Sequence, residues 1–285
     1  MSDAPDIPPQ QQEPPGSTRA MRPEPRDTMD DYQGRGLLTY RKALVTGGDS
    51  GIGRAVAVAF AKEGADVAIA YLKEREDAEQ TAALVQAQGR RAVLLPGDLA
   101  DRDHCAHVVN SAVDQLGGLH ILVNNIAEQR PVDDLTDIGD DEWCHTFDVN
   151  IHSYFRVTKA ALPHLGEGAS IINTASVNGL RGNKSLLAYA TTKGAVIAFT
   201  YSMAQALADR GIRVNAVAPG PVWTPLIPAT LGEETQPEFG KRVPLGRPAQ
   251  PDELAPSYVF LASDVFSSYY TGEVLSALGG EIAAG

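Results

Sequence analysis

The sequence predicts an α/β protein built on a doubly wound parallel sheet. Short apolar runs alternate with longer stretches of helical spacing, and the runs are apolar enough to be buried on both faces. No repeat of solenoid period replaces this alternation. Strands of this kind form a parallel sheet with helices on either side, and such sheets bind ligands outside the carboxyl ends of their strands. We therefore expect functional residues directly after each strand.

The N-terminal 40 residues differ in composition from the rest of the chain. Residues 1–40 are rich in Pro, Gln, Asp and Glu and lack apolar periodicity, so they offer little apolar surface to offset the entropy of ordering. We expect an extended arm that is partly disordered, or that packs across its own domain or a neighbouring subunit. Residues 41–285 then form a single domain.

Within that domain the predicted elements alternate in order. The first strand (43–46) is followed by a helix (52–63), and the second strand (67–71) by another (74–88). The alternation continues with strands at 92–95, 121–124, 170–175 and 213–218 and helices at 102–116, 143–162, 188–209 and 251–262.

Charge and composition exclude several classes of partner. The net charge of −12 disfavours nucleic acid and anionic membranes, which attract clustered Lys and Arg. No apolar stretch approaches the roughly 20 residues of a membrane helix, and the first residues do not resemble a signal peptide. Cys105 and Cys144 lack a disulfide-scaffold spacing, so we expect a soluble, cytoplasmic protein. His104 and His107 lack a third and fourth ligand of defined geometry, so we expect no metal.

A glycine-rich turn, Thr-Gly-Gly-Asp-Ser-Gly-Ile-Gly at residues 46–53, joins the first strand to the first helix. Glycines let the backbone approach a pyrophosphate, and the helix N-terminus attracts the phosphate charge. A nucleoside-triphosphate loop would need Lys and then Ser or Thr where Arg54 and Ala55 stand, so a kinase or ATPase is disfavoured. We expect a dinucleotide cofactor to contact Gly47, Asp49, Ser50, Gly51, Ile52 and Gly53.

Four polar residues point to proton chemistry. Tyr189 and Lys193 are four apart on a predicted helix, so they share a face, and a nearby ammonium favours the phenolate. Ser176 follows the 170–175 strand, where it can donate a hydrogen bond to a substrate oxygen. Asn150 lies in the helix that leads toward this strand. Together they indicate a nicotinamide-dependent oxidoreductase that moves a hydride between its cofactor and a carbonyl or alcohol.

The chain from about Leu37 onward resembles the short-chain dehydrogenase/reductase family. Thr46, Gly47, Gly51 and Gly53 match the family's glycine motif, and Pro219-Gly220 matches a later one. The resemblance implies a Rossmann-type fold and a catalytic tetrad of Asn150, Ser176, Tyr189 and Lys193. In that tetrad, Tyr189 is the general acid/base, Lys193 lowers its pKa and binds the nicotinamide ribose, Ser176 orients the substrate, and Asn150 supports a proton-relay water.

The resemblance also implies further cofactor contacts and a homotetramer. Contacts to the cofactor are expected at Asp98, Leu99, Asn125, Pro219, Gly220, Val222 and Thr224. The family's Asn-Asn-Ala-Gly is replaced by Asn-Asn-Ile-Ala at 124–127, which leaves less room near the adenosine ribose. Within the family, the long Pro-rich arm is typical of bacterial stress-associated oxidoreductases, aldehyde reductases and glucose-ribitol dehydrogenase homologues. The segment 278–280 is expected to close against a neighbouring subunit.

The cofactor preference depends on the end of the second strand. No acidic residue stands at Tyr71 to bind the ribose hydroxyls of NAD, whereas Lys73, Arg75 and Arg54 could meet a 2′-phosphate. Neighbouring Glu74 and Glu76 dilute that positive charge. We therefore favour NADP(H), with NAD(H) as the alternative, and expect Tyr71 and Lys73 to line this part of the site.

The substrate class is left open by the sequence. A Pro-rich segment after Gly220 is long enough to be a lid, with Trp223 or Leu226 lining its apolar wall. Small aldehydes, ketones, sugars and polyols all fit the predicted chemistry. The alternatives are an NADP(H)-binding redox sensor without catalysis and a 3-oxoacyl-carrier reductase, which would need a basic patch such as Arg130, Arg181 and Lys184 at the site mouth.

Overall fold

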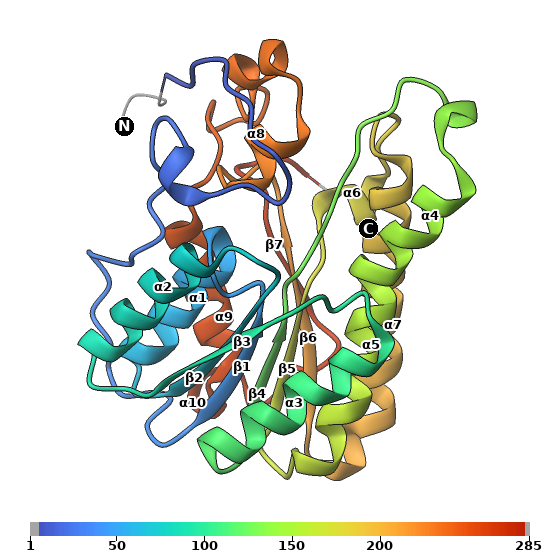
Figure 1. Ribbon diagram of the computed structural model, residues 1–285. Coiled ribbons are helices and arrows are strands. Elements are labelled where there is room, and N and C mark those ends of the chain that lie inside the picture. Colours follow the sequence, from blue (N-terminus) through green and yellow to red (C-terminus); the bar gives the residue numbers. More distant parts are fainter. Residues whose placement is uncertain (1–5, 283–285) are drawn as a thin grey trace.

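A computed structural model describes residues 6–282 and contains, within that range, a seven-stranded parallel sheet (Figure 1). The strand order is β3-β2-β1-β4-β5-β6-β7, and Ala43 of β1 pairs with Val67 on one side and Ile121 on the other. The order reverses direction at β1, as expected for a doubly wound sheet. The strands are β1 Lys42–Thr46, β2 Asp66–Tyr71, β3 Ala92–Pro96, β4 Ile121–Asn124, β5 Ser170–Thr174, β6 Arg213–Pro219 and β7 Val274–Ala277.

Helices cover both faces of the sheet. The clusters of buried residues place α1, α2 and α9 on one face and α3, α5 and α7 on the other (Figure 1). The helices are α1 Gly51–Lys62, α2 Arg75–Ala87, α3 Arg102–Leu116, α4 Asp140–Phe147, α5 Ser153–Ala161, α6 Val177–Arg181, α7 Leu187–Leu207, α8 Leu226–Thr230, α9 Pro251–Ala262 and α10 Asp264–Ser267. No helix within residues 6–282 is both long and apolar enough to cross a membrane.

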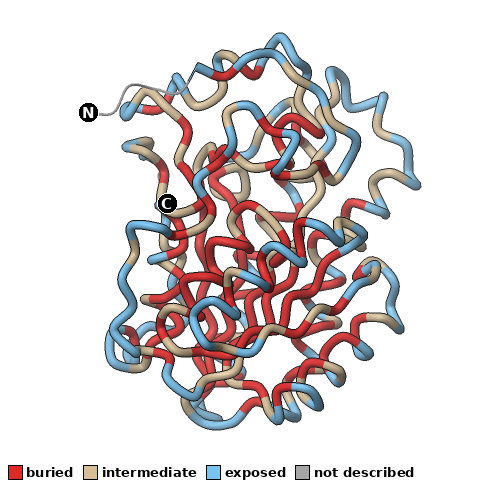
Figure 2. The backbone as a smooth tube through the Cα atoms, turned by 60° about the vertical axis from the view of Figure 1, so that its left-hand side comes forward, coloured by how far each residue is buried: buried red, intermediate tan, exposed pale blue. Residues whose placement is uncertain are grey.

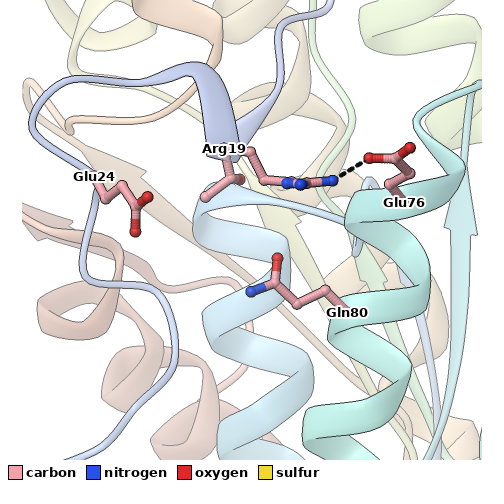
Figure 3. A pocket seen from close by; sticks show the side chains of 5 residues that line it. Arg19, Glu24, Glu76 and Gln80 are labelled. Carbon is pink, nitrogen blue, oxygen red and sulfur yellow. Dashed lines mark hydrogen bonds and ion pairs between the residues drawn. The ribbon is translucent and has the colours of Figure 1, made fainter.

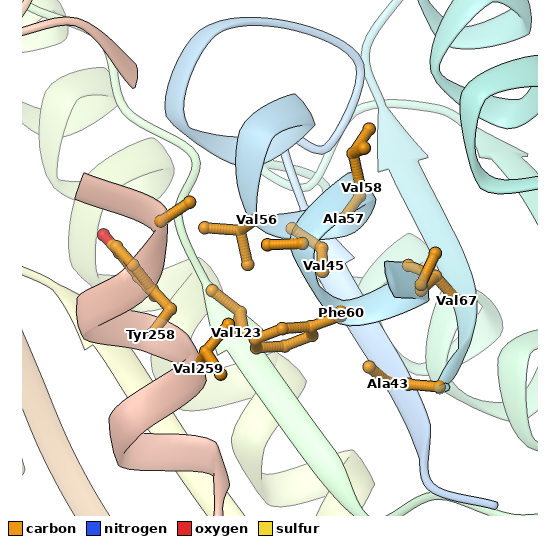
Figure 4. Packing of buried hydrophobic residues seen from close by; sticks show 14 of the residues in the cluster. Ala43, Val45, Val56, Ala57, Val58, Phe60, Val67, Val123, Tyr258 and Val259 are labelled. Carbon is orange, nitrogen blue, oxygen red and sulfur yellow. The ribbon is translucent and has the colours of Figure 1, made fainter. Parts of the chain in front are cut away.

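The core explains why the strands are apolar on both faces. Val45, Val67 and Val123 point from the sheet toward Phe60 of α1 and Val259 of α9 (Figure 4). The tube coloured by burial places the strands in the buried centre and exposed segments at the periphery (Figure 2). Burying such side chains stabilises the fold by about 1.5–3 kcal/mol each relative to exposing them. The predicted α/β fold is thus confirmed.

Two elements differ from the sequence-based expectation. The helix predicted over 143–162 is present as α4 and α5, which are continuous through a π-helical segment, Asp148–His152, that the periodicity did not indicate. Strand β7 was not predicted, since it is short and only half-buried. It pairs in parallel with β6 and thereby extends the sheet beyond the predicted strands.

The N-terminal arm lies across its own domain from residue 6 onward; residues 1–5 are outside the described part. It contains one short 3₁₀ helix, η1 Thr18–Ala20. The last part of the arm is fixed to Glu63, the residue that follows α1. Glu63 is fully buried and accepts hydrogen bonds from the Arg35 and Leu37 amides, at 2.8 and 2.9 Å. Whether the arm also meets a neighbouring subunit stays a prediction.

Candidate active site

The expected site residues gather at one edge of the sheet. Because paired strands run parallel, their carboxyl ends meet there. The residues that follow or end these strands are Gly47 (β1), Tyr71 (β2), Asp98 and Leu99 (β3), Asn125 (β4), Ser176 (β5) and Pro219 with Gly220 (β6).

The glycine turn has the shape that a pyrophosphate requires. Gly47 and Gly51 have φ angles of +63° and +51°, which favour glycine. A Cβ on Gly53 would lie 1.8 Å from the Gly47 carbonyl oxygen, so no side chain fits there. The Ser50 side chain accepts no hydrogen bond from the first amides of α1 within the described part of the chain. The turn therefore presents backbone amides and the positive end of the helix dipole to an anion, and it fits a dinucleotide phosphate.

Asn125 ties the glycine turn to the neighbouring strands. Its Nδ2 donates to the carbonyl oxygens of Thr46 and Gly47, both at 3.2 Å, and its Oδ1 accepts from Thr174 Oγ1 at 3.1 Å. Ile126, which replaces a small residue of the family motif, packs against Gly47. Asn125 thus fixes the turn directly, and its contact with the cofactor stays a prediction.

Arg54 does not face the cofactor side, contrary to one expectation. Its side chain is 1% exposed and pairs with Asp27 of the arm and Asp77 of α2, at 3.5 and 3.2 Å. Its Nε also donates to the Asp49 carbonyl oxygen at 3.0 Å. A buried guanidinium needs such partners, so Arg54 is unable to meet a 2′-phosphate.

The other basic residues near the end of β2 remain accessible. Tyr71 is buried as the last residue of β2, whereas Lys73 and Arg75 are exposed. Arg75 Nε lies 2.7 Å from Glu79 Oε1, one helical turn away. Of the three predicted candidates for a 2′-phosphate contact, Lys73 is therefore the best placed, since Arg54 is buried and Arg75 is paired with Glu79.

Tyr189, Lys193 and Ser176 come together as the sequence predicted. Lys193 Nζ lies 5.7 Å from the centre of the Tyr189 ring and donates to the Thr174 carbonyl oxygen at 2.7 Å. Burial lowers the pKa of Lys193 to about 7. Burial also raises the pKa of Tyr189, while a hydrogen bond with Ser176 opposes that rise. The structure thus differs from the expectation that the pKa of Tyr189 is lowered.

Asn150 lies in the π-helical segment and is fully buried. Its amide exchanges two hydrogen bonds with the Glu128 backbone, at 2.8 and 2.9 Å, and donates to Thr192 Oγ1 at 3.1 Å. π-helical turns inside α-helices are frequent at functional sites. Through these hydrogen bonds, Asn150 connects the segment after β4 with α7, the helix that carries Tyr189.

Tyr154 was missed by the sequence analysis. Its hydroxyl receives a 3.3 Å hydrogen bond from Lys193 Nζ and donates to the Ile126 carbonyl oxygen at 2.9 Å. The available signal was its spacing, since Tyr154 follows Asn150 by four residues. A phenol and a backbone carbonyl, that of Thr174, therefore orient the Lys193 ammonium.

The segment after β6 corrects another expectation. Trp223 is fully buried and its Nε1 donates to the Pro23 carbonyl oxygen of the arm at 2.8 Å, so it does not line a substrate wall. Val222 pairs with Ala249 in an isolated bridge. Thr224 lies beside the glycine turn, because its Cγ2 would be 3.0 Å from a Cβ on Gly51. Leu226 remains half-buried at the start of α8.

A separate polar pocket lies between the arm and α2. It has a volume of about 330 Å³ and is lined by Thr18, Arg19, Glu24, Glu76 and Gln80. Arg19 points toward Glu76 across it and forms an ion pair (Figure 3). Neither Tyr189 nor Lys193 contributes to this pocket, which is therefore distinct from the candidate active site.

The sheet order, the glycine turn after β1 and the Tyr189–Lys193 pair beside β5 define a Rossmann-type, dinucleotide-dependent oxidoreductase. A family model described as "Enoyl-(Acyl carrier protein) reductase" matches residues 47–281. The chain belongs to the short-chain dehydrogenase/reductase family. It is thus an NAD(P)-dependent enzyme acting on CH–OH and C=O groups.

Individual relatives agree with this assignment. The chain is 53% identical to "Uncharacterized oxidoreductase YhdF" of Bacillus subtilis, covering 93% of this chain and 92% of that protein. It is 47% identical to "NADPH-dependent aldehyde reductase 1, chloroplastic" of Arabidopsis thaliana, covering 94% and 95%. A short-chain dehydrogenase from Burkholderia cenocepacia in complex with NADP superposes with a TM-score of 0.80 at 35% identity, covering 86% and 98%.

Proposed function

We propose that the enzyme is an NADP(H)-dependent reductase of small carbonyl compounds, aldehydes first, and that it also oxidises the corresponding alcohols. The observation that supports this most is the grouping of Tyr189, Ser176 and Lys193 at the carboxyl end of β5, next to a turn that fits a dinucleotide phosphate. The similarity to an NADPH-dependent aldehyde reductase supports the substrate class.

In the proposed reaction, Tyr189 gives the proton. When bound next to the glycine turn, a reduced nicotinamide would supply the hydride for the carbonyl carbon. Tyr189 transfers its phenolic proton to the carbonyl oxygen, and the Ser176 hydroxyl orients that oxygen by donating a hydrogen bond. In alcohol oxidation Tyr189 accepts the proton. Asn150 is proposed to hold the backbone at Glu128 in place for a proton-relay water.

Lys193 is proposed to stabilise the tyrosinate that remains. Its ammonium lies beside the Tyr189 ring, and its pKa of about 7 lets it hold or release a proton near neutrality. Burial alone would keep Tyr189 protonated, which suits the acid of a reductase. For the reverse reaction Lys193 would favour phenolate, and an oxidised nicotinamide, when bound, would add its own positive charge.

The preference for NADP(H) is proposed from the end of β2. Lys73 is exposed there and no carboxylate occupies the position that would bind the ribose hydroxyls of NAD. The remaining cofactor contacts predicted from the sequence, from Gly47 to Thr224, are part of the same proposal. The NADP-bound short-chain dehydrogenase of similar fold supports it.

A substrate screen tests the function. Reduced-nicotinamide absorbance is followed with a panel of aldehydes, ketones, sugars and polyols, using both cofactors. We expect aldehyde turnover with NADPH, and Tyr189→Phe should lower kcat by roughly 10²–10⁴-fold, because general acid catalysis contributes about that much. The NADPH dissociation constant, measured by fluorescence, should change little. Cofactor binding without turnover on any substrate would instead favour a redox sensor.

A carrier-bound 3-oxoacyl substrate is less well supported. The family model's description names an enoyl-(acyl carrier protein) reductase, which shares the acyl carrier with this alternative but acts on a C=C bond. Yet two of the three basic residues expected to receive an acidic carrier are paired with acids. Arg181 lies 2.9 Å from Glu281, and Arg130 lies 2.9 Å from Glu142. That leaves Lys184 as the third, exposed candidate, which is too little positive charge for an acidic protein partner.

We also propose that the enzyme assembles as a homotetramer, following the family resemblance, in which segment 278–280 meets a neighbour. The apolar side chains exposed after α9 support an interface, since clustered exposed apolar groups mark contact surfaces. The cytoplasmic location expected from the sequence stays a prediction.

A further inference from the structure

The arm packs on the segment expected to cover the substrate. Here the lid denotes residues 223–239, which include α8. Ile7 and Met21 of the arm form a buried cluster with Trp223 and Ile227 of the lid, and Leu231 and Phe239 pack against it. The arm runs beside α8 on the same side of the molecule (Figure 1). The arm therefore covers the apolar face of the lid that these residues form.

Hydrogen bonds fix the same contact at three points. Trp223 Nε1 donates to the Pro23 carbonyl oxygen at 2.8 Å. The Gln12 amide donates to the Pro228 carbonyl oxygen at 3.0 Å, and Gln236 Nε2 donates to the Gln10 carbonyl oxygen at 2.7 Å. These bonds lie at the start, middle and end of the lid, so the arm holds its whole length.

The start of the lid is enclosed on two sides. A Cβ on Gly16 of the arm would lie 2.5 Å from the Pro225 carbonyl oxygen, and one on Gly51 of the glycine turn would lie 3.0 Å from Thr224 Cγ2. The start of the lid therefore lies between the arm and the glycine turn and is close to both. The arm also reaches the turn through Asp27, which pairs with the buried Arg54.

From these contacts we propose that the arm is a positioning element that sets the lid over the carbonyl substrate, with Met21 and Trp223 as its main contact. The inference rests on the proposed function, because the lid, as expected from the sequence, would cover the carbonyl substrate of that reaction. Neither Met21 nor Trp223 is proposed to touch the substrate. Loosening the contact should raise the substrate KM and leave the chemical step of the saturated enzyme intact.

Two methionines of the arm provide a matched test. Met21 and Met29 are 0% and 2% exposed, but Met21 packs on the lid whereas Met29 packs in the cluster of α1 and α9. Met21→Ala and Met29→Ala remove the same atoms from the same arm, and both should lower Tm. We expect Met21→Ala to raise the aldehyde KM about tenfold, equivalent to about 1.4 kcal/mol. Its kcat and NADPH dissociation constant should stay within about twofold of wild type.

The result that overturns the proposal is an equal KM change in the two variants, or none in Met21→Ala. A second readout needs no turnover. Hydrogen exchange of the Leu231 amide, which bonds to the Ile227 carbonyl oxygen, should accelerate in Met21→Ala and not in Met29→Ala. If wild type turns over no carbonyl compound, the proposed function fails, and this exchange contrast still decides whether the arm positions the lid.

Trp223→Phe serves where Met21→Ala does not fold. It keeps a buried ring but removes the Nε1 hydrogen bond to Pro23. We expect a smaller rise in KM with kcat unchanged, together with faster exchange at Leu231. An unchanged KM with unchanged exchange in this folded variant counts against the arm as a positioning element.

Discussion

Lys193 is a buried amine whose charge titrates near neutral pH, which gives the enzyme a pH-dependent stability. Burial lowers its pKa from 10.5 to about 7. Between about pH 7 and pH 10 the unfolded chain therefore binds a proton that the folded chain has lost. Stability rises with pH where the unfolded state binds more protons, so Lys193 should make the enzyme more stable across this window.

The test compares wild type with Lys193→Met without added cofactor. Urea unfolding at several values between pH 7 and pH 10 gives the free energy of unfolding for each protein. The difference, wild type minus variant, should increase with pH, because the other titrating groups cancel. A difference that is flat or falls with pH contradicts the lowered pKa of Lys193.

At the residue scale, spacing predicted the grouping of Tyr189, Lys193 and Ser176. It did not show which groups orient Lys193, because one is a backbone carbonyl and the other, Tyr154, is 39 residues away in the chain. Arg54 was assigned to the cofactor for a similar reason. Its partners Asp27 and Asp77 lie 27 and 23 residues away, so only tertiary structure shows that they enclose it.

At the scale of elements, the glycine turn gives a sharp prediction. Gly53→Ala places a methyl group 1.8 Å from the Gly47 carbonyl oxygen, so the turn must distort. We expect loss of NADPH binding by fluorescence titration, and a lower Tm. Gly139→Ala is the control, since its φ is −71° and a Cβ there meets nothing within 4 Å. The control should stay within about 0.5 kcal/mol of wild type in stability.

Equal NADPH affinity in the two glycine variants would show that the turn does not hold the cofactor.

Periodicity was sufficient to predict most of the other elements, including α9 with its observed bounds. It predicted a regular helix through the π-helical segment around Asn150, where no Pro or Gly marks the altered turn. There the three hydrogen bonds of the Asn150 amide to Glu128 and Thr192 come from other elements, which local sequence does not reveal.

At the scale of the whole molecule, the predicted tetramer is tested by light scattering. We expect a particle of four times the 30.3 kDa chain mass. Val265 and Tyr269 are 74% and 98% exposed, and burying them against another subunit would be favourable. The double variant Val265→Asp, Tyr269→Asp should therefore have a smaller particle mass.

Tyr40→Asp is the control for that experiment, because Tyr40 is 82% exposed near the end of the arm. Its particle mass should equal that of wild type. A monomeric wild type contradicts the tetramer, whereas an unchanged double variant excludes these two residues from the interface. Composition identified the arm itself, but its path across the lid depends on contacts with residues 200 or more positions later and was not predictable.

Those contacts also have a consequence for how the chain folds during synthesis. The ribosome makes the arm first, yet the partners of Gln10 and Met29, namely Gln236 and Asp252, are separated from them by 226 and 223 residues. The contacts of the arm with the lid and with α9 can therefore form only when nearly the whole chain has been translated, whereas its contacts with α1, such as Asp27 with Arg54, can form earlier. Since contacts that close so long a loop form slowly, docking of the arm on the lid should be among the last steps of folding. Burial of Trp223 would then report, by its fluorescence, the moment at which a newly made enzyme is complete.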